Sequence, residues 1–475
     1  MTKQDQIPKT VDAAPVKSFF VHMLTRDIKL EDAILDLLDN SVDGILRSRL
    51  REKSHTTNNP YSGYWAEIEF KKDSFTISDN CGGIPWDKHD YAFRMGRLPG
   101  GPPDAPGSVG VYGIGMKRAI FKMGKRCLIE TQSGDYIYDV DISPTWTDDE
   151  DNWKIPVKSS NKSRPEDGTT VHIGELYEGI ADRFSQDSLA FKADLQRLVA
   201  THYVSIIQKG FRVKINGDVV KPRPIKLVFD EKIIRKKKNA ICPYIFKAKI
   251  DEVDVFLAVG FTRPIPSQDE IAEDQEEKKY SSLDAGWTIL CNDRAVLYCD
   301  RTELTGWGDA GVPRYHTQFI AISGIVEFKA DDASKLPTTT TKRGVDASST
   351  LYLQVKNKMR EGMQIFTNYT NKWKGEPEES RKQIEAGEPL SLDDLKTESL
   401  QLAFNSTKTS FPAGEQFKPS LPQPKRLNPQ MRRITFFKPV GHVRLVADYL
   451  YDDPNEHPAV VGERCFDIQL KEARK

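Results

Sequence analysis

Residues 28–50 read IKLEDAILDLLDNSVDGILRSRL, and this stretch decides the fold that the sequence predicts. At 100° per residue, its apolar side chains follow one side of an α-helix. Three polar side chains, Asp36, Asn40 and Asp43, fall together on the opposite side. Aspartate and asparagine are poor helix formers, because their side chains compete for backbone hydrogen bonds. This side of the helix is either a solvated face or a functional one, and the stretch alone leaves both interpretations open.

The bulk composition predicts several domains and no general affinity for nucleic acids. A chain of 475 residues is too long for one ordinary core and suggests two or three domains. Its 69 Lys and Arg residues balance 69 Asp and Glu residues, so the formal net charge is zero. Only a local basic patch could then support contact with DNA.

Cysteine spacing and hydropathy predict the cellular environment. The six cysteines are scattered without a Cys-x-x-Cys pair, which argues against structural zinc and favours reduced thiols. No apolar run approaches the roughly 20 residues that a membrane-spanning helix needs. The first residues, MTKQDQIPKTVDAAP, lack the apolar centre of a signal peptide. We therefore expect a cytoplasmic protein with no membrane partner.

Two pairs of alternating runs predict β-hairpins in a sheet with one covered face. The first pair is AEIEF at 66–70 and SFTIS at 74–78. The second lies within 127–142 and turns around Ser133 and Gly134. A long loop follows, and DGTTVHIGEL then reads as a turn and a further strand.

A carboxylate and two glycines stand at the end of the first hairpin. Asp79 has the same parity as Ile77, so its side chain is expected to point toward the covered face, where it needs hydrogen-bond donors. The alternative is an ordinary Asx-type turn formed with Asn80. Gly82 and Gly83 then make the turn and let the backbone approach a ligand.

A second glycine-rich segment, GVYGIGMKRAIFKMG at 110–124, runs from a loop into an apolar helix. Free N–H groups at such a helix start bind phosphate, helped by the helix dipole. Gly110, Gly113 and Gly115 allow the chain to approach a triphosphate, and Lys117 could reach a phosphate oxygen. An ordinary tight turn is the alternative interpretation.

The segment between these two glycine-rich turns, residues 86–108, is rich in Gly and Pro. This composition forbids regular structure. The segment is either a plain surface loop or a lid that orders when a ligand binds.

Four segments, in this order and spacing, resemble the nucleotide-binding boxes of the GHKL, or Bergerat-fold, ATPase superfamily. They are the opening helix, ISDNCGGIP, GVYGIGMKRAIFKMG and DGTTVHI. The superfamily includes DNA gyrase, the large heat-shock chaperones, MutL, histidine kinases and the MORC proteins. The segment YGIGMKRA resembles the YGxGxKxG box of the MORC-like branch, so the resemblance is strongest to MORC- and MutL-like ATPases. The resemblance covers residues 17–180 and extends more weakly to residue 345.

The resemblance implies ATP and Mg²⁺ as ligands, with a role for each matching residue. Asn40 supplies the protein oxygen that binds Mg²⁺, and Asp36 stands where the family has the base that activates water. Asp79 accepts a hydrogen bond from the adenine amino group, and Thr169 supports it. Asp43 is expected to fix the helix to the adenine-side network.

The sequence departs from the family pattern at two positions. The family has Glu where this chain has Asp36, whose side chain is one methylene shorter, so we expect slow hydrolysis. The family pattern Asp-x-Gly-x-Gly is also changed, since Cys81 stands at the first glycine position. Gly83 matches the second glycine, and the role of Gly82 is correspondingly less defined.

The β-rich runs after a helix at 189–209 resemble the S5-like transducer domain that follows the nucleotide domain in MutL, gyrase and MORC proteins. They begin with FRVKING and continue through IKLVFD, YIFKAKI, VDVFLAVGF, GWTILCNDRAVLY and AISGIVEFKA. In those families a transducer lysine reaches the terminal phosphate, and Lys342 in LPTTTTKRGVD stands at the matching place. Arg343 and Lys335 are rivals, and a solvated loop cation is the alternative.

Two charged segments interrupt this second domain. The basic cluster KIIRKKKN at 232–239 is either a nucleic-acid contact or a solvated loop. The acidic segment QDEIAEDQEEKK at 268–279 is expected to be a flexible loop.

We therefore predict an α+β fold with three structured regions. A Bergerat-type α/β sandwich forms the nucleotide domain, an S5-like α/β transducer domain follows, and a small C-terminal α/β region has a strand before two short helices. The predicted boundaries are an extended arm at 1–16, the nucleotide domain at 17–195, the transducer-like domain at 196–373 with a long final helix, a linker at 374–430 and the C-terminal region at 431–475.

The function implied by the resemblance is a Mg²⁺-dependent ATPase that dimerises when ATP binds, in a DNA-related or defence complex with DNA or protein partners. A non-hydrolysing nucleotide switch or scaffold and a chaperone-like ATPase are the alternatives. A histidine kinase fits poorly, because His22 is the only upstream histidine and no dimerisation helices can precede it.

Overall fold

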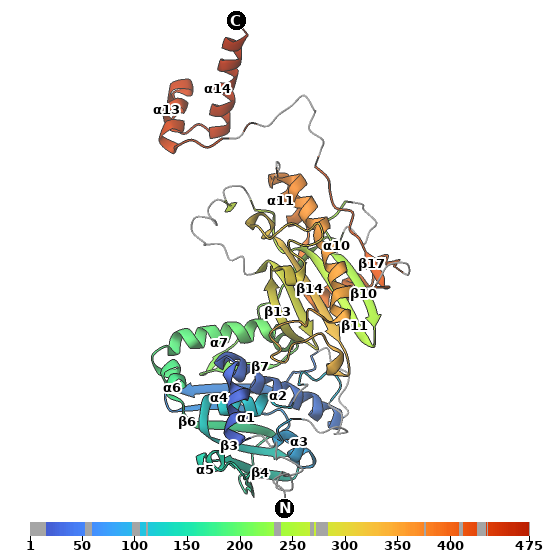
Figure 1. The fold of residues 1–475 in the computed structure, drawn as a ribbon. Helices are drawn as coiled ribbons and strands as arrows, with labels where there is room; N and C mark the ends of the chain where they lie inside the picture. Colours follow the sequence, from blue (N-terminus) through green and yellow to red (C-terminus); the bar gives the residue numbers. More distant parts are fainter. Residues whose placement is uncertain are drawn as a thin grey trace, which may run out of the picture. The chain divides into compact units, whose positions relative to one another are not determined.

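The computed structural model describes residues 16–52, 59–96, 105–110, 113–231, 239–266, 270–271, 284–374, 377–407, 412–424, 434 and 436–474 (Figure 1). The chain divides into two compact units, Met1–Gln423 and Pro424–Lys475. The predicted arm, apart from Val16, lies outside the described residues, as do most of the basic cluster and most of the acidic loop.

A mixed sheet organises the first part of the larger unit. Within the described residues it has eight strands in the order β5-β4-β3-β6-β2-β1-β7-β8, and every neighbouring pair is antiparallel except β1 and β7. The strands are β1 (Trp65–Lys71), β2 (Ser74–Asp79), β3 (Gly124–Ser133), β4 (Tyr136–Ile142), β5 (Val157–Ser159), β6 (Gly168–Leu176), β7 (Arg212–Ile215) and β8 (Asp218–Val219).

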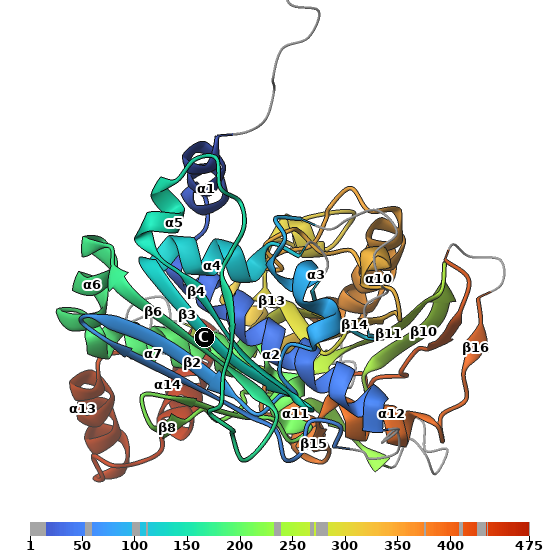
Figure 2. The same cartoon turned by 90° about the horizontal axis from the view of Figure 1, so that it is seen from below.

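Helices cover one face of this sheet, because its apolar side chains alternate. Along β2, Phe75, Ile77 and Asp79 are buried and their neighbours are partly exposed. Figure 2 shows the helices of the covered face crossing the strands. They include α2 (Leu30–Glu52) and α4 (Gly115–Met123), while α1 (Lys17–Arg26) packs against α4. The first part of the chain is thus a two-layer α/β arrangement, as the alternation predicted.

Both predicted hairpins are confirmed. In the first, β1 and β2 pair with Ile68 opposite Ile77. In the second, β3 and β4 pair with Ser133 opposite Tyr136, and Gly134 turns with φ 59°. The remaining helices of this part are η2 (Trp86–Lys88), α3 (His89–Phe93), α5 (Pro144–Asp148), α6 (Glu178–Ser185), α7 (Ser188–His202) and α8 (Val204–Gln208).

One strand belongs to a different sheet from the one predicted. The run FRVKING was assigned to the second domain, but β7 within it pairs in parallel with β1, with Trp65 opposite Arg212. Val213 and Ile215 are fully buried in the first core. Alternation predicts a strand without predicting its neighbour, so the first sheet extends past the boundary expected at residue 195.

A second sheet follows, with seven strands among the described residues in the order β13-β12-β14-β11-β10-β17-β16. Most of its central strands are buried on both faces. The long helix α10 (Thr350–Trp373) packs against the neighbouring strands β10, β11 and β14. Asn292 and Asp293 make the predicted turn between β12 and β13, with φ 48° and 66°. The strands are β10 (Tyr244–Ile250), β11 (Val253–Phe261), β12 (Gly286–Cys291), β13 (Arg294–Asp300), β14 (Ile322–Lys329), β16 (Asn405–Ser406) and β17 (Glu415–Phe417).

The segment predicted to be a linker is largely folded onto this second sheet. It contributes β17, which pairs with β10, and β15 (Glu388–Leu390), which pairs with β9 (Leu227–Phe229). It also forms α11 (Pro377–Glu385) and α12 (Leu392–Ser399). The linker prediction was wrong for these residues, because a few widely spaced apolar side chains are enough to anchor a polar segment. Ile384 and Leu395 are buried at 1% and 0% exposure.

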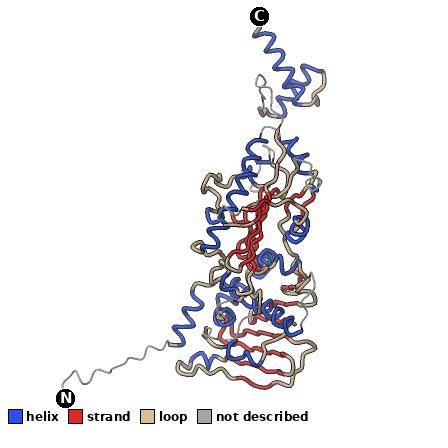
Figure 3. Tube along the Cα trace, turned by 90° about the vertical axis from the view of Figure 1, so that its right-hand side faces the viewer, coloured by secondary structure: helices blue, strands red, loops and turns tan. Residues whose placement is uncertain are grey.

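The smaller unit is helical where the structure describes it. It contains α13 (Val440–Tyr451) and α14 (Pro458–Ala473), and Figure 3 shows helices and no strand in its described part. The two predicted helices are present, whereas the strand predicted before them falls largely on residues 431–435, of which only Ile434 is among the described residues. Within the described ranges of the whole chain, no helix is both long and apolar enough to cross a bilayer.

Candidate functional site

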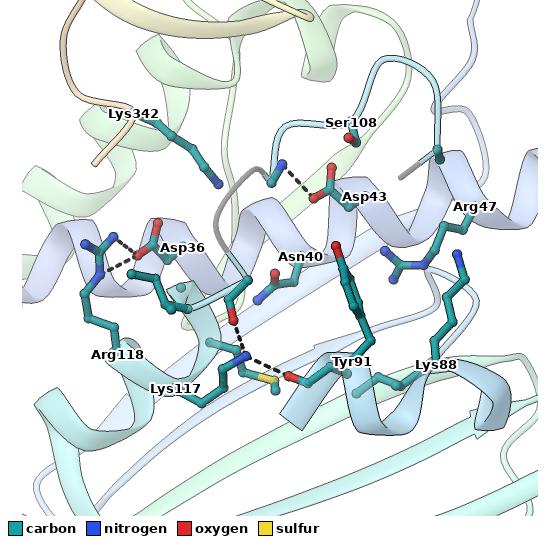
Figure 4. A pocket seen from close by; sticks show the side chains of 18 of the residues that line it. Asp36, Asn40, Asp43, Arg47, Lys88, Tyr91, Ser108, Lys117, Arg118 and Lys342 are labelled. Atoms are coloured by element: carbon teal, nitrogen blue, oxygen red, sulfur yellow. Dashed lines mark hydrogen bonds and ion pairs between the residues drawn. The ribbon is translucent and has the colours of Figure 1, made fainter. Parts of the chain in front are cut away.

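A cavity of about 160 Å³ lies along α2 and brings distant segments together (Figure 4). Its walls come from α2, the η2–α3 segment, the glycine-rich loop before α4, and the loop before α10. The predicted site residues that line it are Asp36, Asn40, Asp43, Gly110, Gly113, Gly115, Lys117 and Lys342.

A smaller cavity of about 50 Å³ adjoins the first, since both are lined by Asn40, Arg47, Ile84 and Met116. It holds the other predicted residues Asp79, Gly83 and Thr169, whereas Gly82 lines neither cavity.

Asn40 is the exposed polar side chain in the middle of the larger cavity (Figure 4). Its neighbours in sequence, Asp39 and Ser41, are buried at 1% and 3% exposure. The Asn40 amide makes no hydrogen bond with any residue in the described ranges. A hard cation such as Mg²⁺ prefers oxygen ligands and needs few from the protein, so a single accessible amide oxygen beside carboxylates fits this metal.

Asp36 is buried at 4% exposure and forms an ion pair with Arg118 of α4. Its Oδ2 accepts hydrogen bonds from Nε at 3.1 Å and Nη2 at 2.5 Å. Burial raises the pKa of Asp36, although Lys342 and Arg118 oppose that change. A Cβ on Gly115 would lie 3.3 Å from Cβ of Asp36, so this glycine lets the two helices approach closely. The sequence analysis did not identify Arg118.

Asp43 holds the glycine-rich loop. Its Oδ1 accepts from the Val109 N–H at 2.7 Å, and its Oδ2 accepts from the Gly110 N–H at 2.9 Å. A Cβ on Gly110 would lie 2.5 Å from that Oδ2, so a larger residue there would displace the Asp43 carboxylate that holds the loop. We predicted a tie to the adenine-side network, but the hydrogen bonds that Asp43 accepts come instead from the glycine-rich loop for which phosphate binding was predicted.

Asp79 points inward as its parity predicted and is held by three donors. They are the Ser41 hydroxyl at 2.7 Å, the Cys81 N–H at 2.9 Å and the Thr169 N–H at 3.2 Å. Burial raises the pKa of Asp79, against the lowering effect of these bonds. Cys81 donates through its backbone, which explains why this position tolerates a side chain where the family pattern has glycine.

The turn after Asp79 depends on glycine at position 83. Gly82 and Gly83 have φ 87° and 64°, in the left-handed region that favours glycine. A Cβ on Gly83 would lie only 1.9 Å from the carbonyl oxygen of Gln132 on β3. The turn is thus pressed against the sheet, which forms the floor of the smaller cavity.

Replacing Gly83 by alanine is expected to lower the free energy of unfolding by roughly 3 kcal/mol or more, since the added Cβ meets backbone that cannot move aside. Gly134→Ala is a matched control, because Gly134 has a similar φ of 59° and a Cβ added there would meet nothing within 4 Å. That control is expected to lose about 1 kcal/mol. Chemical denaturation measures both, and equal losses would contradict the close packing.

Lys117 is buried at 2% exposure and donates to the carbonyl oxygens of Ala92, at 2.8 Å, and Gly113. It thereby connects α3 to the glycine-rich loop while lining the cavity. Its contact with a phosphate oxygen stays a prediction.

Lys342 lines the cavity, while its two rivals face elsewhere. Its ammonium lies 2.8 Å from Oδ2 of Asp39, on the neighbouring side of α2. Arg343 pairs with Asp32 at 2.5 Å, and Lys335 pairs with Glu252; neither lines the cavity. Of the three candidates, Lys342 is therefore the one placed to reach a ligand there.

Sequence reasoning also missed other lining residues, among them Arg47, Lys88 and Tyr91 (Figure 4). Lys88 and Tyr91 belong to η2 and α3, within the segment 86–108 that was expected to lack regular structure. The Gly and Pro residues that suggested a loop are concentrated after residue 94, so composition averaged over the segment concealed two short helical turns.

The comparison with protein families agrees with this geometry. Residues 28–169 match the family model described as histidine kinase-, DNA gyrase B- and HSP90-like ATPase. The match contains α2, both glycine turns and Thr169, and it supports the GHKL superfamily for this part of the chain. No curated protein matches the chain.

Proposed function

We propose that this protein binds Mg²⁺-ATP in the paired cavities along α2, hydrolyses it slowly, and uses the bound nucleotide to control dimerisation. The observation that carries the proposal is the exposed Asn40 amide, which stands between two buried carboxylates and faces the glycine turns. The MORC- or MutL-like character, and a role with DNA or in defence, follow from the resemblance of the motifs and belong to the proposal.

The two cavities suit the two ends of a nucleotide. The smaller one presents the Asp79 carboxylate, which can accept from an exocyclic amine. The larger one presents glycine backbone and the cations Arg47, Lys88 and Lys342, which suit phosphate oxygens. When bound at Asn40, Mg²⁺ would neutralise phosphate charge that develops during hydrolysis.

In this proposal, Asp36 accepts a proton from the attacking water. Its raised pKa makes it a better base than an exposed aspartate, and Arg118 holds one of its oxygens in a fixed direction. The same ion pair reduces the basicity of that oxygen, and the side chain is shorter than glutamate. Both features favour slow turnover.

The second candidate function is a nucleotide switch that does not hydrolyse ATP. The specific observation in its favour is the Asp36–Arg118 pair, because a carboxylate engaged by two N–H donors is less available to water. In that case Lys342 and the glycine-rich loop would still respond to the nucleotide.

Asp36→Asn distinguishes these functions. Removing the base is expected to lower the ATP hydrolysis rate by about 100-fold or more, while ATP affinity changes little. Phosphate release under saturating Mg²⁺-ATP measures the rate, and Asp73→Asn, in the exposed β1–β2 turn, is the control. Equal non-zero rates in wild type and Asp36→Asn would remove Asp36 as the base. No turnover by the wild type, together with Mg²⁺-dependent binding, would favour the switch.

A further inference from the structure

A groove of about 340 Å³ lies apart from the nucleotide cavities, beside α7 and β13. Four arginines from separate segments line it: Arg197, Arg223, Arg301 and Arg343. None of the described residues that line it is acidic. Since the whole chain carries no net charge, four guanidinium groups without an acidic lining residue are a local concentration of positive charge.

The present partners of these arginines leave them able to bind an anion. Arg197 pairs with Asp194 at 2.8 Å, and both side chains are more than half exposed, at 58% and 54%. Arg223 pairs with Asp284 at 3.1 Å, also near the surface. Such exposed pairs contribute little to stability, so a ligand that binds the guanidinium group with better geometry can replace the carboxylate.

The other two guanidinium groups differ in their surroundings. Arg301 lies over the ring of Tyr315, 4.7 Å from its centroid, and has no carboxylate partner in the described part of the chain. Arg343 is recessed, with its side chain 25% exposed, and pairs with Asp32 of α2 at 2.5 Å. The groove thus has Arg197 at its rim and Arg343 deeper inside.

His202 completes the wall without adding charge. It is buried at 7% exposure, and its Nδ1 lies 2.6 Å from the carbonyl oxygen of Ala295, to which it must donate. Burial, together with Arg294 and Arg343, lowers the pKa of His202 to about 3. The positive charge of the groove therefore comes from arginines, which keep their proton at any physiological pH.

We propose that this groove binds a compact ligand carrying two or more phosphate groups. Guanidinium groups form paired, directional hydrogen bonds with phosphate oxygens, and four of them converge here from different segments. Duplex DNA fits less well, because its phosphates are spread along the double helix, whereas these four guanidinium groups line one groove and Arg343 is only 25% exposed.

The groove is connected to the nucleotide cavity through one loop. Consecutive residues of this loop, Lys342 and Arg343, line the cavity and the groove respectively. Both also bond to α2, at Asp39 and Asp32. A phosphate that takes Arg343 from Asp32 would change the contact between this loop and α2, which makes the groove a place from which a ligand can regulate the nucleotide site.

The test uses inorganic tripolyphosphate as the probe, with the full chain, and isothermal titration calorimetry without Mg²⁺. Arg197→Gln combined with Arg301→Gln is expected to weaken binding at least about tenfold, since both substitutions remove charge-assisted hydrogen bonds to phosphate. Arg126→Gln combined with Arg212→Gln, two exposed arginines of the first sheet, is the matched control and is expected to bind as the wild type does.

The nucleotide cavity is tested separately with Lys88→Gln, which removes one of its cations. Unchanged affinity in the groove variant, or an equal loss in Lys88→Gln, would overturn the proposal. A 20-base-pair duplex that binds more tightly than tripolyphosphate at the same salt, and that loses affinity in the groove variant, would overturn the compact ligand in favour of DNA. Thermal unfolding of each variant shows that folding is retained.

Discussion

Replacing Asn40 by alanine is expected to abolish Mg²⁺-dependent ATP binding while the fold remains intact. The side chain is exposed in the cavity and bonds to no described residue, so its loss removes no contact that stabilises the protein. Alanine is also a better helix former than asparagine, by roughly 0.5 kcal/mol. Since Asn40 is the protein ligand proposed for Mg²⁺, the affinity is expected to fall by more than the roughly 10- to 100-fold that indirect ligands contribute.

Titration with ATP in the presence of Mg²⁺ and then of a chelator measures this effect. Asn161→Ala is the matched control, because Asn161 is also exposed but lies in the connection between β5 and β6. Mg²⁺-dependent affinity that survives in Asn40→Ala would contradict the site. The same samples test dimerisation, since light scattering is expected to show a doubled mass for the wild type with a non-hydrolysable ATP analogue, and no change for Asn40→Ala or with ADP.

Local patterns were sufficient to predict the parts of the site that depend on one segment. Helical periodicity placed Asp36, Asn40 and Asp43 on one side of α2, and all three line the cavity. Strand parity predicted that Asp79 points inward, and its three hydrogen bonds agree. The glycine turns were predictable because left-handed backbone and close approach restrict residue choice, as the φ of Gly83 shows.

Contacts between distant segments could not be predicted in the same way. Arg118 stands 82 residues from Asp36, and Arg294 stands 255 residues from Asp39. Their pairing depends on how helices and sheets pack, which no periodicity encodes. Asp39 was overlooked for a related reason, because it lies on neither the apolar arc nor the side that carries Asn40.

Misassigned segments have a similar cause. Periodicity identified the strand β7 but not its parallel partner β1. Trp65 of β1 pairs with Arg212 of β7, and the two residues are 147 positions apart in the sequence. The Pro, Glu and Lys content of residues 377–423 suggested a linker, although part of this segment is folded. Ile384 and Leu395 are isolated apolar residues in a polar segment, and both are buried. Composition describes the average of a segment, whereas packing depends on individual side chains.

The second large effect is expected from Asp39, which joins α2 to the second sheet. Its carboxylate accepts hydrogen bonds from Arg294 Nε at 3.0 Å, from Lys342 at 2.8 Å and from the Tyr203 hydroxyl at 2.6 Å. The side chains of Asp39 and Arg294 are each only 2% exposed. Asp39→Asn keeps the shape and removes the charge, which leaves a guanidinium buried without its anion.

The free energy of unfolding of Asp39→Asn is expected to be roughly 3–5 kcal/mol lower than that of the wild type, the usual consequence of breaking a buried ion pair. Tyr203→Phe is the matched control, because it removes a hydrogen bond to the same carboxylate without changing a charge, and about 1 kcal/mol is expected. Urea denaturation at pH 7 measures both. A loss for Asp39→Asn no larger than that for Tyr203→Phe would show that the pair does not hold the two sheets together.

The acid limb of the stability curve provides an independent check on the same carboxylate. Burial alone would raise the pKa of Asp39, but Lys342 and Arg294 outweigh it and lower the pKa to about 2 from an ordinary value of 3.8. A lowered pKa means that the folded state favours the ionised form, so this stabilisation is present above pH 3.8 and is lost as the pH falls toward 2. The difference in free energy of unfolding between wild type and Asp39→Asn is therefore expected to shrink by about 2 kcal/mol as the pH falls from 5 to about 2. Parallel curves for the two proteins would mean that Asp39 is not ionised in the folded state, and that Lys342 and Arg294 are held by other groups.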